Sequence, residues 1–308
     1  MTPSQNVYEP SADALRWVVD SVGPGAKIQS VYRLAGATSS AVYCIEIEYN
    51  GRCFKLVLRL FVKEDWLAEE PDLALHEAES LKKAGEANLP TPDVIAYDEK
   101  ASHCGVPAVL MTYLPGVVEL KPVNLDNWLY QLAESLISVH AVEVGTYPWR
   151  YFSWNDMSCL EPPSWSKHRE LWEKAIEIVL QPEPEERACF IHRDYHPTNV
   201  LWQDNRISGV IDWVNACRGP ASVDLSHCRG NLFALYGVAA ADRFLHAYQS
   251  LVGGAFEYQP YWDLTVAIGA LPEPGIYPPW IEFGIRHLNT DILKEHADEF
   301  LASVMARF

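Results

Sequence analysis

Positive charge is scarce in this sequence, which has 24 lysines and arginines against 41 aspartates and glutamates and a formal net charge of −17 at pH 7. Nonspecific binding to nucleic acid or to an anionic membrane depends on clustered basic residues that neutralise phosphates. The charge balance therefore predicts that neither nucleic acid nor a membrane is a partner. It is compatible with a cationic small molecule.

Cysteines in a paired, metal-binding spacing are also missing. The chain has 7 cysteines, an odd number, and no two of them form a C-x-x-C motif. This pattern supports neither a disulfide framework nor a thiolate zinc site. We expect reduced, buried thiols in a cytoplasmic protein.

A long hydrophobic run is the third absence. The most apolar stretch, VPAVLMTYLPGVV at residues 106–118, is short and contains proline and glycine. Residues 1–10, MTPSQNVYEP, have neither the basic segment nor the apolar segment of a secretory leader. The chain is therefore predicted to have no membrane span and no leader.

Apolar and aromatic residues, in contrast, are abundant. Residues of the apolar classes make up 49% of the 308 residues, with 11 Trp, 15 Tyr and 10 Phe among them. This content is enough to bury a core and excludes a disordered chain. The length suggests two lobes, and we expect a monomer or a homodimer.

The first part of the sequence is patterned as antiparallel strands. Residues 27–34, 41–49 and 52–60 alternate apolar and polar side chains, and an Asn50-Gly51 turn joins the last two segments. Two further strands are predicted at 89–98 and 106–116. In the third strand, alternation separates a core face from a second face. The core face carries Phe54, Leu56, Leu58 and Leu60, and the second face carries Lys55, Val57 and Arg59.

Residues 69–85 are predicted to form a helix, because their apolar residues recur at i, i+3 and i+4 spacing. Glu77 interrupts the apolar stripe of this helix. A buried carboxylate needs a partner, so we expect a cation beside Glu77. The pattern alone leaves open an alternative in which a tilted or frayed helix exposes Glu77 to solvent.

Pro115-Gly116 is the predicted boundary between the two halves of the chain. Residues 1–115 form a strand-rich half with a hinge near 111–116, and residues 116–308 form a mainly helical half. Asn124 is predicted to cap a helix that continues to about Val139. The fold class is therefore α+β. Further helices are predicted at 164–180, 222–237, 240–252, 259–270 and 290–306.

The segment FIHRDYHPTNVLW, residues 190–202, is unusually rich in polar functional groups. A hairpin is predicted directly after it, with strands at 200–202 and 207–211 and a turn at Asp204-Asn205. The hairpin returns the chain to the polar loop. Three oxygen-bearing side chains can then converge on one point, and oxygen ligands suit Mg²⁺. They are Asp194, Asn199 and Asp212.

The spacing His192-Arg193-Asp194-x-x-x-x-Asn199 is typical of phosphoryl transfer, in which the Asp accepts the proton of the acceptor hydroxyl and the Asn holds a metal. A competing hypothesis is a metal-dependent hydrolase or oxygenase. In a regular strand, His192, Asp194 and His196 would share one face and could bind a metal. The Pro197-Thr198 pair favours a loop over a strand, and the metal triad would leave Asn199 unexplained.

Residues 191–227, IHRDYHPTNVLWQDNRISGVIDWVNACRGPASVDLSH, resemble the aminoglycoside phosphotransferase and choline kinase-like family, whose members are related to protein kinases. The resemblance extends to LHEAESLKKAGEANLPTPDVIAYD, VLMTYLPG and LAESLISVHAV. It implies a protein kinase-like, two-lobed fold. Residues 1–115 would form the nucleotide-binding lobe, and residues 116–308 would carry the catalytic loop and the acceptor site.

The resemblance also implies roles for the loop residues. Asp194 is the expected catalytic base, His192 organises the loop by hydrogen bonding, and Arg193 lies between them. Asp224 is expected to be a buried anchor of the catalytic loop. Arg193 departs from the family pattern, because many antibiotic kinases have glycine at this position.

ATP and Mg²⁺ are the implied cofactors. Asn199 and Asp212 correspond to the metal ligands, Arg59 stands where the family places a phosphate-binding lysine or arginine, and Glu77 is its helix partner. Arg59 replaces the commoner lysine and keeps its charge. Gly36 is a lone glycine in the expected phosphate loop at 35–40. The remaining residues of the predicted nucleotide site are Thr38, Ser39, Val57, Met111, Thr112 and Tyr113.

The sequence as a whole therefore predicts an ATP-dependent kinase that phosphorylates a hydroxyl of a small molecule. Residues 117–308 contain 25 acidic and 14 basic residues, which favours a cationic acceptor. Acidic side chains near aromatic or proline-rich loops are Asp156, Glu161, Asp263, Glu273 and Glu282. A non-catalytic nucleotide-binding module is the third hypothesis.

Overall fold

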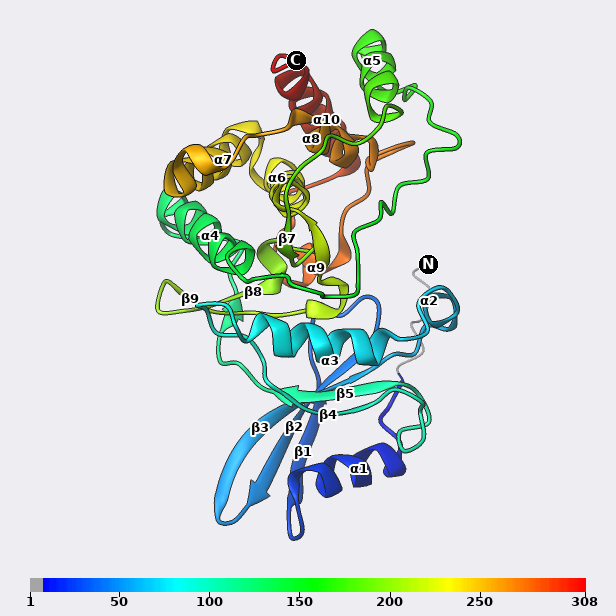
Figure 1. Ribbon diagram of the computed structural model, residues 1–308, viewed down its shortest axis with the longest axis vertical. Coiled ribbons are helices and arrows are strands. Elements are labelled where there is room, and N and C mark those ends of the chain that lie inside the picture. The colour runs from blue at the N-terminus through cyan, green and yellow to red at the C-terminus, as the bar shows by residue number, and fades with distance from the viewer. Residues whose placement is uncertain (1–7) are drawn as a thin grey trace. The chain divides into compact units, whose positions relative to one another are not determined.

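The predicted N-terminal strands are present in the computed structural model, which describes residues 8–308 (Figure 1). Residues 1–7, part of the segment predicted to lack a leader, lie outside the described residues. The chain forms two compact units. Among the described residues, the first unit comprises 8–86, 90–115 and 213–215, and the second comprises 87–89, 116–212 and 216–308.

The first unit is built around a five-stranded antiparallel sheet with the order β1-β2-β3-β5-β4. Asn50 and Gly51 close the β2–β3 hairpin with φ values of 53° and 72°, the left-handed conformation that this turn requires. The strands are β1 (Lys27–Arg33), β2 (Ala41–Tyr49), β3 (Arg52–Leu60), β4 (Val94–Asp98) and β5 (Ala108–Thr112).

One face of this sheet packs against helix α1 (Ala12–Val22), which the sequence analysis did not predict. Ser11 caps the helix by accepting a hydrogen bond from the Ala14 N–H at 3.1 Å. Leu56, Leu58 and Leu60 are buried on this face as predicted, but Phe54 is 37% exposed because it lies near the hairpin end of β3. Helices α2 (Glu64–Glu69) and α3 (Leu73–Ala84) follow β3.

The second unit combines short sheets with helices. Strand β6 (Val117–Val118) pairs with the hairpin formed by β8 (Val200–Gln203) and β9 (Arg206–Val210). Strand β7 (Ala188–Ile191) pairs with β10 (Cys217–Pro220), so the two ends of the segment that contains the polar loop are hydrogen-bonded together. This pairing fixes the two ends of the segment that carries the predicted site residues.

The helices of the second unit follow the predicted order, apart from the short helix α9 (Pro278–Glu282), which was not predicted. Asn124 caps α4 by accepting from the Asn127 N–H at 3.0 Å. Helix α5 begins at Arg169 rather than at residue 164, because residues 164 and 165 form a turn and residues 166–168 are not helical. The α+β class is confirmed. The helices are α4 (Leu125–His140), α5 (Arg169–Val179), α6 (Ala221–Tyr236), α7 (Val238–Val252), α8 (Pro260–Ile268), α9 (Pro278–Glu282) and α10 (Thr290–Met305).

The cysteines and the helices test two predictions, that the thiols are buried and that no segment spans a membrane. All seven cysteines are free, but Cys53 and Cys159 are exposed, so only part of the prediction of buried thiols is correct. Within residues 8–308, no helix combines the length and apolar character needed to cross a bilayer.

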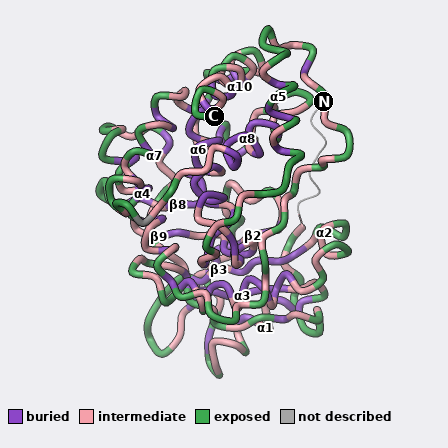
Figure 2. Tube along the Cα trace, turned by 45° about the horizontal axis from the view of Figure 1, so that its top comes forward, coloured by how far each residue is buried: buried purple, intermediate pink, exposed green. Residues whose placement is uncertain are grey.

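Helix α6 is buried on most of its sides, as its mainly purple trace in Figure 2 shows. It contains a charged residue, Arg229, whose side chain is fully buried together with that of Asp263 on α8. The Arg229 Nε donates to both carboxylate oxygens of Asp263, at 3.1 and 2.9 Å, and Nη1 donates to the Ala241 carbonyl at 2.7 Å. The ion pair joins α6, α7 and α8.

Loss of one partner should leave the other charge buried without compensation. Arg229→Met is expected to lower the free energy of unfolding by about 3–5 kcal/mol, measured by urea denaturation. Arg243→Met is the matched control, because its ion pair with Asp126 is exposed and should contribute at most about 1 kcal/mol. Equal losses in the two variants would contradict a structural role for the buried pair.

Candidate functional site

The polar loop is anchored by Asp224, which lies in the first turn of α6 and is fully buried. Its two carboxylate oxygens accept from the backbone N–H groups of His192, at 2.8 Å, and Arg193, at 2.6 Å. The Nε2 of His140 on α4 lies 3.1 Å from the same carboxylate. The carboxylate therefore fixes the start of the loop, as the family resemblance implies for Asp224.

Arg193 adopts a left-handed backbone conformation with φ of 68°, which is uncommon for a residue with a long side chain. Its guanidinium lies 3.9 Å from the ring centroids of both Phe152 and Trp154. Its Nη2 also donates to the Phe152 carbonyl at 2.7 Å. The side chain thus holds the aromatic segment around residue 153 in place, and its catalytic role stays a prediction.

His192 is directed toward the end of the β8–β9 hairpin. Its Nε2 lies 2.9 Å from the carbonyl oxygen of Ile211, the residue that precedes Asp212. The ring therefore links the start of the polar loop to the strand end that carries Asp212. This contact agrees with the predicted organising role of His192.

Asp194 and Asn199 lie together at the centre of the loop. The Asn199 amide Nδ2 donates to the Asp194 main-chain carbonyl at 2.9 Å and approaches the Asp194 Oδ2 at 3.4 Å. The chain between them ends in a 3₁₀ turn at Pro197–Asn199, so the segment is a loop and not a strand. The loop that Pro197 and Thr198 predict is thus confirmed.

The β8–β9 hairpin returns the chain toward Asn199 just before Asp212. Val200 pairs with Val210, and the Ile211 N–H donates to the Asn199 carbonyl at 2.9 Å. Asp212 follows Ile211 directly, with φ of 68°. The chain reversal that the sequence predicts is therefore present.

Two histidines border the carboxylate of Asp194. The His227 Nε2 lies 3.0 Å from the Asp194 Oδ1, and the His196 Nε2 lies 3.6 Å from the same oxygen. Burial lowers the pKa of His196 to about 4, so its ring is neutral at neutral pH. Burial by itself would raise the pKa of Asp194, but the hydrogen bond from His227 opposes this effect, and the pKa of Asp194 lies below its ordinary value. Asp194 is therefore an ionised carboxylate at neutral pH.

His140 and His227 were not identified as site residues from the sequence. The structure instead places His140 against Asp224 and His227 against Asp194. The spacing Asp224-x-x-His227 was the available signal, because residues three apart lie on the same face of a helix. This spacing identifies His227 as a site residue only when that face of the helix is known to border the polar loop.

The predicted residues of the first unit include an ion pair. The Arg59 Nη1 lies 2.5 Å from the Glu77 Oε1, and the side chains are 8% and 1% exposed. Arg59 alternates with Leu58 and Leu60 along β3, so it points to the face opposite the α1 core. The predicted cation beside Glu77 is Arg59, and the alternative of an exposed Glu77 is wrong.

The other predicted nucleotide-site residues lie on the same sheet or beside it. Val57 on β3 is the direct cross-strand neighbour of Met111 on β5. The Thr112 hydroxyl accepts from the Asp93 N–H at 2.8 Å, and Tyr113 follows β5. Gly36, Thr38 and Ser39 occupy the turn between β1 and β2, where Gly36 has φ of 87°.

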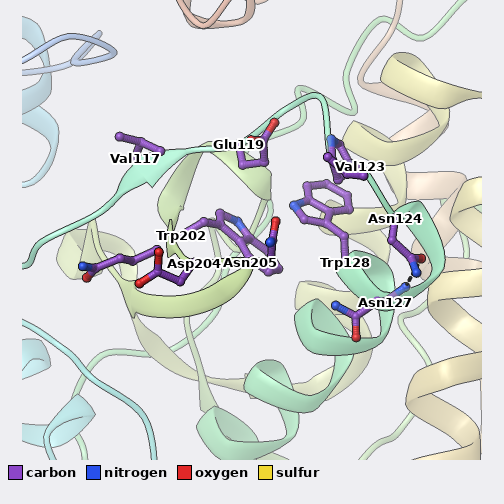
Figure 3. Close-up of a pocket in the computed structure, with 11 residues that line it drawn as sticks. Val117, Glu119, Val123, Asn124, Asn127, Trp128, Trp202, Asp204 and Asn205 are labelled. Atoms are coloured by element: carbon purple, nitrogen blue, oxygen red, sulfur yellow. Dashed lines mark hydrogen bonds between the residues drawn. The ribbon is translucent and has the colours of Figure 1, made fainter.

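A separate pocket of about 430 Å³ lies in the second unit (Figure 3). The indoles of Trp128 and Trp202 line this pocket and stack with centroids 5.8 Å apart. None of the predicted site residues lines this pocket. It is therefore distinct from the polar loop, and the tip of the β8–β9 hairpin and the start of α4 form its walls.

The acidic residues considered for a cationic acceptor are not equivalent. Asp263 is buried in the ion pair with Arg229, and Glu273 pairs with Lys294 at 2.5 Å. Asp156 and Glu161 are exposed. The number of acidic side chains that can meet an acceptor is thus smaller than the sequence count suggests.

Asp224→Asn should loosen the polar loop, because an amide nitrogen would replace one of the oxygens that accept from the loop N–H groups. The expected cost is about 1–3 kcal/mol in the free energy of unfolding, with faster amide hydrogen exchange at His192 and Arg193. Asp126→Asn, at an exposed ion pair, serves as the control. Unchanged exchange at both amides would contradict the anchoring role.

Sequence comparisons identify relatives of the chain. A model of the Phosphotransferase enzyme family matches residues 31–261. An aminoglycoside 3'-phosphotransferase of Enterococcus faecalis is 24% identical over 164 residues, covering 46% of this chain and 60% of that protein. An N-acetylmuramate/N-acetylglucosamine kinase of Neisseria meningitidis serogroup B is 34% identical over 59 residues, covering 19% and 17%. The chain thus spans 60% or less of each of these curated relatives.

Solved structures share the fold. A thermostable mutant of aminoglycoside phosphotransferase APH(4)-Ia, in a ternary complex with ADP and hygromycin B, matches with a TM-score of 0.57 at 14% identity. The match covers 94% of this chain and 97% of that one. The protein kinase-like fold that the sequence predicts is thereby confirmed. Since the family model spans well over half of the 308 residues, the chain belongs to the phosphotransferase enzyme family.

Proposed function

We propose that this phosphotransferase transfers the γ-phosphoryl group of ATP to a hydroxyl group of a small molecule, with Asp194 as the catalytic base. The observation that carries this proposal is the set of contacts that fix the main chain and the carboxylate of Asp194. The Asn199 Nδ2 donates to the Asp194 main-chain carbonyl at 2.9 Å, and the His227 Nε2 lies 3.0 Å from the Asp194 Oδ1. A fixed, ionised carboxylate that is 24% exposed can meet a substrate hydroxyl and accept its proton.

The donor set at the end of the hairpin fits Mg²⁺. The Asn199 amide nitrogen is directed to Asp194, which leaves the amide oxygen as the metal-ligand atom. Asp212 supplies a carboxylate one residue beyond the Ile211–Asn199 hydrogen bond. Mg²⁺ prefers one or two such oxygens together with phosphate oxygens. When bound, it would neutralise charge on the phosphates.

Arg59 is the proposed phosphate-binding cation of the first unit. Glu77 fixes its guanidinium from one side, which orders a side chain that would otherwise be mobile. Val57 and Met111, adjacent across β3 and β5, are proposed to contact the adenine. In this family positioning and electrostatic stabilisation supply most of the catalysis, so these fixed groups are the relevant ones.

The acceptor is proposed to be a small alcohol, with a cationic one favoured. The net charge of −17 and the aminoglycoside 3'-phosphotransferase relative both support this choice. The second relative is named as a kinase of N-acetylated amino sugars, so neutral sugars belong in the test. The hydrolase or oxygenase hypothesis is not favoured, since His192 contacts the Ile211 carbonyl instead of joining Asp194 and His196.

The catalytic proposal is tested by ATP consumption with a panel of aminoglycosides, choline, amino alcohols and N-acetylated amino sugars. With any acceptor that is turned over, Asp194→Asn should reduce kcat by ~10²–10⁴-fold, the usual contribution of a general base. Asp204→Asn, at the exposed hairpin turn, is the matched control and should keep its turnover. Near-normal kcat in Asp194→Asn would remove this residue from the mechanism.

Asp212→Ala should instead abolish Mg²⁺-dependent nucleotide binding, because it removes the charged ligand of the proposed metal site. Calorimetry with ATP in the presence and absence of Mg²⁺ measures this effect. Asp194→Asn should retain MgATP binding in the same experiment. An unaltered affinity for MgATP in Asp212→Ala would exclude the proposed ligand role.

A further inference from the structure

Three side chains of the second unit, the proposed base among them, form a cluster with a metal-binding capacity that phosphoryl transfer does not use. They are Asp194, His196 and His227, and one ligand atom from each lies within 4.8 Å of the other two. The two histidine Nε2 atoms lie 3.6 and 3.0 Å from the Asp194 Oδ1. In a tetrahedral zinc site with bonds of 2.0–2.1 Å, neighbouring ligand atoms are about 3.3 Å apart. The two distances from the Asp194 Oδ1 are close to this value, and the two histidine ligand atoms, which lie within 4.8 Å of each other, would move together to hold one ion.

The groups around the cluster orient its ligand atoms. The His196 Nδ1 lies 2.9 Å from the Thr198 hydroxyl, so a proton on Nδ1 leaves the lone pair of Nε2 directed toward Asp194. The Oδ2 of Asp194 faces the Asn199 amide, which turns Oδ1 toward the histidines. Metal-binding histidines and carboxylates are typically fixed by such outer contacts. The arrangement thus has the supporting contacts of a metal site.

Exposure gives the cluster an access route. The His196 side chain is 5% exposed, whereas His227 and Asp194 are 30% and 24% exposed. An ion can therefore reach the two outer ligands from solvent and bind the inner one next.

The chemistry of the ligands selects the metal. Two imidazole nitrogens and one carboxylate oxygen suit zinc and other first-row transition metals. Mg²⁺ prefers an octahedral set of oxygens and loses its water reluctantly, so it is a poor competitor here. The cluster also differs from the His192, Asp194 and His196 triad considered from the sequence, because His227 of α6 replaces His192.

We propose that Asp194, His196 and His227 form a transition-metal site that binds Zn²⁺ and thereby inhibits phosphoryl transfer. Zinc on Oδ1 occupies a lone pair of the carboxylate and places a positive charge beside it, so Asp194 no longer accepts a proton. The metal site stands on its own geometry, whereas its inhibitory effect rests on the proposed function of Asp194.

Metal binding is tested first, without nucleotide or Mg²⁺, in a Cys53→Ser, Cys159→Ser background that removes the two exposed thiols. The protein is titrated with Co²⁺, whose visible absorption reports four-coordinate binding, and then with Zn²⁺ in competition. We expect one strongly bound ion per chain. His227→Gln should weaken its binding by more than ~10²-fold, because loss of a ligand exceeds the ~10–10²-fold effect of losing an outer contact.

Two further variants separate the cluster from other histidines and from folding defects. Thr198→Val, which keeps the shape of the side chain but not its hydroxyl, should weaken the metal by about 10-fold. His287→Gln changes an exposed histidine outside the cluster and should leave binding unaltered. Circular dichroism confirms that each variant is folded. Absence of a one-to-one complex, or equal affinity in the background protein and His227→Gln, would overturn the site.

The inhibitory effect is measured with any acceptor found in the panel, at saturating MgATP. Zn²⁺ should reduce turnover in the background protein, and the concentration that halves turnover should rise by more than ~10²-fold in His227→Gln. Zinc that binds without reducing turnover would refute the inhibitory effect and leave the site standing. If no acceptor is phosphorylated, the proposed function fails, while the cobalt titration still decides the metal site.

Discussion

The candidate site depends on a single buried carboxylate, Asp224, which accepts hydrogen bonds from two consecutive backbone N–H groups. Those N–H groups belong to His192 and Arg193, and the latter has an uncommon positive φ of 68°. A backbone held in this conformation needs strong local partners. A fully buried carboxylate in turn needs hydrogen bonds, so each side of the interaction stabilises the other. The position of Asp194 follows directly from this anchor.

A second constraint acts at the other end of the loop. The β8–β9 register, together with the Ile211–Asn199 hydrogen bond, fixes the residue after Ile211 relative to Asn199. The His192 ring joins the two constraints, since it lies 2.9 Å from the Ile211 carbonyl. Residues up to 32 positions apart in the sequence are thus held together by a few hydrogen bonds. The buried Arg59–Glu77 pair fixes the proposed phosphate-binding group in the first unit in a comparable way.

Much of the fold and part of the candidate site could be predicted from the sequence. The alternation in β3 placed Arg59 on the face opposite the core, and the apolar stripe of α3 predicted a cation beside Glu77, while the family resemblance implied that the two pair with each other. Helix α1 and the exposure of Phe54 were missed. The signal for α1 was present in the sequence, since Ser11 is a typical N-cap residue and Ala14 and Val18 have the i, i+4 spacing of a buried helix face. The exposure of Phe54 depends on what packs against the end of the strand, which the local pattern does not determine. The roles of the site residues in catalysis remain predictions.

The sequence by itself determined the elements and the order of reactive groups, since periodicity, turn residues and the spacing from His192 to Asn199 are local properties. Only the tertiary structure decided which groups meet. It directed His192 to Ile211, placed the Arg193 guanidinium between two aromatic rings, and brought His227 of α6 to Asp194. The physical reason is that such contacts depend on helix rotation and strand register, which are set by packing over the whole unit. Spacing along the chain does not encode them.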